Sequence, residues 1–178
     1  MAMTLEDFKA ARRVLDGVIS PTHLVHSPAF SAASGNQVYL KPENLQVTGA
    51  YKIRGATYKI STLTEEQRQR GLITASAGNH AQGVAMAAQK AGCRAVIVMP
   101  TTTPLVKVNN TKALGAEVVL FGGTFDDAAA KAHELETAQG LTYIPPFNDP
   151  TVSPRQGTIA YQIISHLPDV DLILVPIG

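Results

Sequence analysis

Lys52 stands in a run of small, aromatic and apolar residues that can hold its amine partly out of water. From residue 48 to residue 56 the run reads Thr-Gly-Ala-Tyr-Lys-Ile-Arg-Gly-Ala. Removal from water disfavours the ammonium form of a lysine, and a neutral amine can attack a carbonyl carbon to form a Schiff base. Most lysines are solvated surface charges, so this run needs a second element before it indicates a reactive amine.

The second element is the segment Ser76-Ala77-Gly78-Asn79-His80, which follows an expected strand and precedes an expected helix. The first N–H groups of a helix have no partner within it and lie at its positive end, so they can bind a carboxylate or a phosphate. Gly78 would let a ligand approach the backbone closely. The alternative is that the Gly-Asn pair only makes a tight turn. No Gly-x-Gly-x-x-Gly follows a strand, so a dinucleotide site lacks its usual pattern.

Together the two segments resemble the fold-type II family of enzymes that use pyridoxal 5'-phosphate (PLP), and within it the threonine (serine) dehydratases. Residues 50–56 match the run that carries the family's cofactor lysine, and residues 76–80 match its substrate-binding asparagine loop. The likeness continues through nearly the whole chain, in residues 41–46, 115–120, 124–128 and 156–158.

The resemblance implies a role for each matching residue. Lys52 would carry PLP and then act as the base that removes the substrate's α-proton. Tyr51 and Asn79 would contact the cofactor, and Gly178 would begin the turn that binds its phosphate. Ser76 to His80 would bind the carboxylate of the substrate. The implied reaction converts L-threonine or L-serine to 2-oxobutyrate or pyruvate and ammonia by α,β-elimination.

Other polar residues have structural interpretations. Arg54 is expected to cap or pair near the lysine, and Asp126 and Asp127 are expected in the first turn of a helix. Cys93 is expected to be a small buried hydrophobe. No metal-ligand spacing is found, and no metal is expected, among the remaining histidines His23, His26, His133 and His166.

Strands alternate with helices in the expected secondary structure. Strands are predicted at residues 37–41, 72–75, 95–99, 118–121, 141–144 and 172–175. Helices are predicted after Thr4 and at residues 52–63, 79–91, 104–114, 125–139 and 154–167. The alternation indicates βαβ units, hence an α/β fold with parallel open sheets and helices on both faces. Ligands of such sheets bind beyond the carboxyl ends of the strands.

The composition agrees with a buried sheet and with a small-molecule ligand. Only 16% of the 178 residues are charged, against about 25% on average. The net charge of +1 argues against a nucleic-acid or anionic-membrane surface. Neither a signal segment nor an apolar run of about 18 residues is found, so we expect a cytoplasmic protein that does not bind membranes.

Two domains are expected. Residues 49–146 would form a smaller α/β domain, and residues 1–48 and 147–178 would form an incomplete part of a larger PLP-binding domain. The sequence stops where the resembled family continues into a glycine-rich phosphate turn, so we expect an N-terminal part that is truncated and inactive alone. Its last apolar strand would have an open edge that favours a homo-oligomer.

Two alternatives remain open. A serine racemase-like β-eliminase would use the same lysine and asparagine motifs. A non-catalytic binding or assembly module would keep the fold and the anion site without the reaction. Capture of PLP by Lys52 would separate the enzymes from the module.

Overall fold

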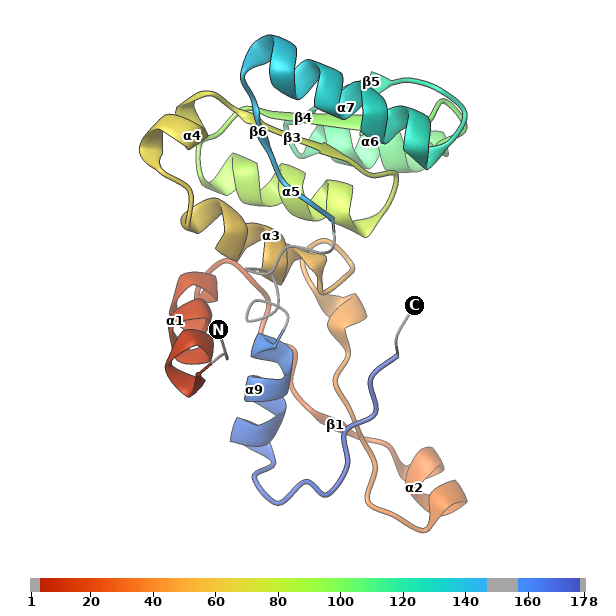
Figure 1. The fold of residues 1–178 in the computed structure, drawn as a ribbon. Helices are drawn as coiled ribbons and strands as arrows, with labels where there is room; N and C mark the ends of the chain where they lie inside the picture. Colours follow the sequence, from red (N-terminus) through yellow and green to blue (C-terminus); the bar gives the residue numbers. More distant parts are fainter. Residues whose placement is uncertain (1–3, 147–156, 177–178) are drawn as a thin grey trace.

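Helix α3 (Lys52–Ser61) lies between two groups of elements in the computed structural model, which describes residues 4–146 and 157–176 (Figure 1). One group is a parallel sheet with its helices. The other group combines segments from both ends of the described chain, which lie side by side below α3 in Figure 1. The first residue of α3 is Lys52, so the candidate lysine lies where the two groups meet.

The sheet has four parallel strands in the order β5-β4-β3-β6. These are β3 (Leu72–Ala75), β4 (Ala95–Met99), β5 (Glu117–Leu120) and β6 (Thr142–Tyr143). In the register, Leu72 lies opposite both Ala95 and Thr142. The chain passes from β3 to β4 on one side, whereas β6 lies on the other, so the strand order reverses between β3 and β6. Open α/β sheets bind ligands at such a reversal.

Helices cover both faces of this sheet, as the sequence predicts. Helices α5 (Asn79–Lys90) and α6 (Leu105–Ala113) cover one face, with α3 packed on the outer side of α5, and α7 (Phe125–Gln139) covers the other face (Figure 1). Side chains alternate along the strands: Leu72 and Ile97 pack towards α3 and α5, whereas Ile73 and Val96 contact α7. The strands are therefore apolar on both faces, which explains their continuous hydrophobic runs.

Close packing of α5 against α3 depends on Gly83. A Cβ atom at this position would lie 3.2 Å from the carbonyl carbon of Lys52 and 3.3 Å from the nitrogen of Ile53. These separations are shorter than ordinary van der Waals contacts, so the missing side chain lets the two helices meet. The backbone of Lys52 is thereby held against α5.

Capping boxes mark the beginnings of three of the described helices. Thr4 caps α1 (Leu5–Leu15), and Thr124 caps α7 with Asp127 bonding back to the Thr124 nitrogen. The predicted places of Thr4, Asp126 and Asp127 are thus confirmed. Helix α4 (Glu65–Gln69) has a similar box and was not predicted.

The second group of elements is mostly short. Strands β1 (Val25–His26) and β2 (Tyr39–Leu40) pair antiparallel, and α2 (Pro28–Ser34) connects them. A turn of 3-10 helix, η1 (Glu43–Leu45), follows β2. Helix α9 (Thr158–His166) packs on α1, which packs in turn on α3. Only part of the predicted strand at 37–41 is present, and α2 lies in a stretch for which no helix was predicted.

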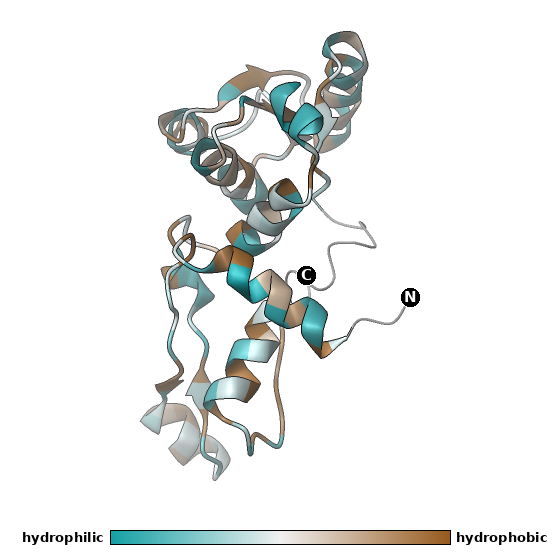
Figure 2. Ribbon diagram, turned by 90° about the vertical axis from the view of Figure 1, so that its left-hand side faces the viewer, coloured by the Kyte–Doolittle hydropathy of each residue, from teal (hydrophilic) through white to brown (hydrophobic). Residues whose placement is uncertain are grey.

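Two sequence-based expectations need correction. The predicted strand at 172–175 is wrong: the segment is not paired within the described residues, and Leu172 and Leu174 are 73% and 84% exposed. Figure 2 shows the segment after α9 largely in the brown of hydrophobic residues. An apolar run becomes a strand only beside a partner that completes its hydrogen bonds. Cys93 is half-buried rather than buried. The predicted helix start at 154–156 lies outside the described residues.

Replacing Gly83 by Ala tests the contact between α3 and α5. Overpacking costs about 1–3 kcal/mol, whereas alanine gains about 1 kcal/mol in a helix interior. We expect the free energy of unfolding in urea to fall by about 1 kcal/mol. Gly123→Ala is the control, because a Cβ there would meet nothing within 4 Å. A higher free energy of unfolding in Gly83→Ala would contradict this expectation, because it would show that α3 moves aside without losing stability.

Candidate active site

The amine of Lys52 lies against the backbone that follows β6. Its Nζ donates a hydrogen bond of 3.2 Å to the carbonyl oxygen of Pro146. The same nitrogen is 5.6 Å from the centre of the Tyr51 ring. Lys52 is half-buried, and the Tyr51 ring next to it is 40% exposed. The amine is thus held at the strand reversal of the sheet, with one side open to solvent.

The segment Ser76 to His80 forms a tight turn at the end of β3. The nitrogen of Ser76 donates to the carbonyl of Val98 in β4, at 3.1 Å, and extends the sheet by one residue. The nitrogen of Gly78 donates to the Ser76 hydroxyl at 3.2 Å. Ser76 is buried, Ala77 and Gly78 are half-buried, and Asn79 is exposed as the first residue of α5. The turn therefore places the beginning of α5 at the carboxyl edge of the sheet.

Open space adjoins this turn at Gly78. A Cβ atom on Gly78 would meet nothing within 4 Å. The first N–H groups of α5 have no acceptor within the helix and lie at its positive end. A carboxylate or phosphate group suits such donors. The residues present thus fit an anionic group beside the amine of Lys52, as PLP and an amino acid require.

His80 is buried, with only 7% of its surface exposed. Its Nε2 donates to the carbonyl oxygen of Ile144 at 3.2 Å, since a carbonyl can only accept. Burial lowers the pKa of His80 to about 4; the acceptor at Ile144 opposes this shift, and the nearby charge of Lys52 adds to it. The imidazole is therefore neutral at pH 7. His80 thus connects the segment that follows β6 to α5.

The structure brings most of the predicted site residues together. Lys52 and His80 bind carbonyl oxygens of the same short segment, at Pro146 and Ile144. Both residues lie at helix beginnings, and Gly83 holds the two helices in contact. Gly178 lies outside the described residues. The carbonyls had no signal in the sequence, because main-chain atoms are the same in every residue.

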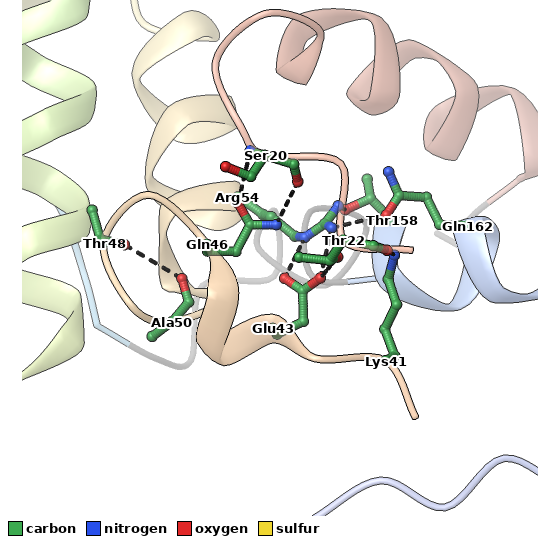
Figure 3. Close-up of polar contacts among 10 residues, drawn as sticks. All are labelled: Ser20, Thr22, Lys41, Glu43, Gln46, Thr48, Ala50, Arg54, Thr158 and Gln162. Atoms are coloured by element: carbon green, nitrogen blue, oxygen red, sulfur yellow. Dashed lines mark hydrogen bonds and ion pairs between the residues drawn. The ribbon is translucent and has the colours of Figure 1, made fainter. Parts of the chain in front are cut away.

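Sequence reasoning missed the partners of Arg54. Its guanidinium is fully buried and donates to both carboxylate oxygens of Glu43, each at 2.8 Å (Figure 3). It also donates to Gln162 at 2.8 Å and to Thr158 at 3.4 Å. The predicted pairing near the lysine is confirmed. A positive charge inside a buried apolar run requires a carboxylate partner. The position of Arg54 in such a run was therefore the signal that could have indicated a buried ion pair.

Two further searches concern metals and membranes. Within residues 4–146 and 157–176, no three His, Cys, Asp or Glu residues are grouped so that they could hold a metal ion. None of the helices in these ranges combines the length and apolar character needed to cross a bilayer.

The sequence matches the model of the pyridoxal-phosphate dependent enzyme family over residues 15–178, so the chain belongs to this family. A curated relative, the L-threonine ammonia-lyase of Thermotoga maritima, is 51% identical over 176 residues, which are 99% of this chain and 44% of that protein. The chain thus spans a little under half the length of this relative.

Solved structures agree with this assignment. Threonine deaminase isoform 2 from Solanum lycopersicum has a TM-score of 0.85 at 42% identity, covering 95% of this chain and 51% of that chain. Maize serine racemase has a TM-score of 0.90 at 30% identity, covering 96% of this chain and 52% of that chain. The predicted likeness to threonine dehydratases, the α/β fold and the PLP class are confirmed.

Removal of the His80 imidazole is expected to flatten the pH dependence of stability. The unfolded histidine binds a proton below its ordinary pKa of 6.5, whereas the folded one does so only near its pKa of about 4. Stability is therefore lost as the pH falls between these values, by about 3 kcal/mol. Urea unfolding of the parent and of His80→Gln at pH 7 and pH 4 measures the difference, because titrating carboxylates are common to both. Equal losses in both chains would contradict the prediction.

Proposed function

We propose that this chain provides the cofactor lysine and the carboxylate-binding turn of a PLP-dependent dehydratase acting on L-threonine or L-serine. The observation that carries the proposal is that Lys52 and His80 bind carbonyl oxygens two residues apart, at Pro146 and Ile144, at the strand reversal. The Thermotoga relative is named for L-threonine, which supports this substrate class. The products would be 2-oxobutyrate or pyruvate and ammonia.

When bound, PLP would supply an electron sink for the charge left at the substrate's Cα. Lys52 would hold the cofactor, and its amine would then accept the α-proton. The N–H groups of residues 76–80 would bind the substrate carboxylate at the positive end of α5. Asn79 and Tyr51 would contact the cofactor ring, and Gly178 its phosphate. His80, neutral at pH 7, would hold the backbone beside the amine without donating a proton to the substrate.

We further propose that residues 49–146 form the smaller domain and that residues 1–48 and 147–178 belong to the larger, PLP-binding domain. In support, all four parallel strands and their covering helices fall within 49–146, and so do most residues of both hydrophobic clusters. A homo-oligomer is a related proposal, supported by exposed apolar side chains such as Val25, Leu40 and Leu174. A cytoplasmic location stays a prediction.

A second candidate is a serine racemase-like enzyme. The TM-score of 0.90 with maize serine racemase favours it. The two candidates differ in their products, because a racemase forms D-serine from L-serine whereas a dehydratase forms a 2-oxo acid. The chain is incubated with PLP and either L-threonine or L-serine. Chiral analysis of the amino acid and a 2-oxo acid assay then distinguish the two candidates. A binding module would form neither product.

The role of Lys52 is tested by reducing the chain with borohydride in the presence of PLP and mapping the adduct by peptide mass spectrometry. We expect the adduct at Lys52 in the parent and its loss in Lys52→Ala, together with loss of the visible absorbance band. Lys112→Ala, at an exposed lysine of α6, is the matched control and keeps the adduct. Labelling spread evenly over surface lysines in the parent would refute the role of Lys52.

A further inference from the structure

We propose that Arg54 is a positioning residue for Lys52, because its buried ion pair with Glu43 fixes the first turn of α3. The inference rests on the proposed role of Lys52 and adds a residue that contacts neither substrate nor cofactor. Arg54 follows Lys52 by two residues and lies in the first turn of α3. Its partners come from η1 and α9, in the second group of elements (Figure 3).

The ion pair is buried and bidentate, which fixes the geometry of both side chains. Arg54 has no exposed surface, and its planar guanidinium presents donors in a fixed fork that matches a carboxylate. Burial by itself raises the pKa of Glu43, but hydrogen bonds from Arg54 and Thr22, with the charges of Arg54 and Lys41, lower it overall. Glu43 is therefore ionised at neutral pH. Removing one partner would leave the other as an uncompensated buried charge.

Glu43 is itself held in place. The Thr22 hydroxyl donates to Glu43, and the Lys41 amine donates to the carbonyl oxygen of Thr22. One turn along, the side-chain amide of Gln46 exchanges two hydrogen bonds of 3.0 Å with the backbone of Ser20 (Figure 3). These contacts join residues 41–46 to residues 20–22. Arg54 therefore bonds to a fixed carboxylate rather than to a mobile surface group.

Helix geometry connects this anchor to the lysine. Two residues along a helix correspond to a rotation of about 200°, so Arg54 and Lys52 extend from nearly opposite sides of α3. On one side Arg54 bonds to Glu43 and to Gln162 of α9. On the other side Gly83 packs against the backbone of Lys52. The first turn of α3 is thus fixed from both sides, which sets the direction of the Lys52 side chain.

The test replaces the whole ion pair in the double variant Arg54→Met/Glu43→Met. Apolar residues of similar volume frequently preserve stability at a buried ion pair, so this variant separates positioning from folding. The control is Arg68→Met/Glu65→Met, which removes an exposed pair of 2.8 Å at α4. For each chain we would measure the urea midpoint, the rate of borohydride-trapped PLP capture at Lys52, and the acetylation of Lys52 by trace acetic anhydride without PLP. Exposed Lys112 is the internal reference for acetylation.

We expect the double variant to keep its urea midpoint while PLP capture at Lys52 slows on the order of tenfold to 100-fold. Acetylation of Lys52 should rise towards that of Lys112, since the amine is less firmly held. Arg54→Lys, which keeps the charge but only one bond to Glu43, should give intermediate values, and the control pair should change neither readout.

Parental capture and acetylation in a double variant with a parental midpoint would overturn the inference. The inference would also be overturned if the rates of PLP capture and acetylation at Lys52 correlated with the urea midpoint across all variants and not with the number of bonds to Glu43. A parent chain without an adduct at Lys52 would refute the proposed function instead. The acetylation experiment would still decide the role of Arg54, because it needs no cofactor.

Discussion

The buried ion pair between Arg54 and Glu43 orients the two groups of elements where they meet at α3. Arg54 has no access to water, and among residues 4–146 and 157–176 its guanidinium bonds to side chains of η1 and α9. The partners in α9 are distant in sequence, since Thr158 is 104 positions from Arg54. Any structure that separated α9 or η1 from α3 would leave a desolvated cation behind. A single helix thereby joins the sheet to segments from both ends of the described chain.

The candidate site is built from this junction and from the order of the strands. The reversal between β3 and β6 places the segments that follow these two strands next to each other. The beginning of α5 lies in the segment after β3. Backbone atoms position the two side chains of the site: the carbonyl of Ile144 accepts a hydrogen bond from His80, and that of Pro146 accepts one from Lys52. Side chains supply the amine and the neutral imidazole.

Local signals in the sequence predicted the central elements. The apolar runs of β3 and β4 and the capping Thr124 indicated their elements directly. Lys52 was singled out by the small and apolar residues around it, whereas the role of Asn79 came from the family resemblance. Helix α2 was missed although Ser27 and Pro28 are common at helix beginnings. The strand expected at 172–175 failed because pairing depends on a neighbour, which an apolar run does not specify. The bonds of Arg54 join residues too distant in sequence for any local pattern to reveal.

The hydrogen bond from Lys52 to Pro146 has a thermodynamic consequence. An amine nitrogen that is bonded to a covalent partner cannot also keep its original hydrogen bond to the carbonyl of Pro146. Modification of the Lys52 amine therefore competes with this hydrogen bond to the segment that follows β6. A hydrogen bond of this kind is worth on the order of 1 kcal/mol, which is several-fold in an equilibrium constant. Linkage is reciprocal. A ligand that binds the Lys52 amine weakens the attachment of residues 144–146. Conversely, a change that stiffens this segment lowers the affinity of the amine for such a ligand.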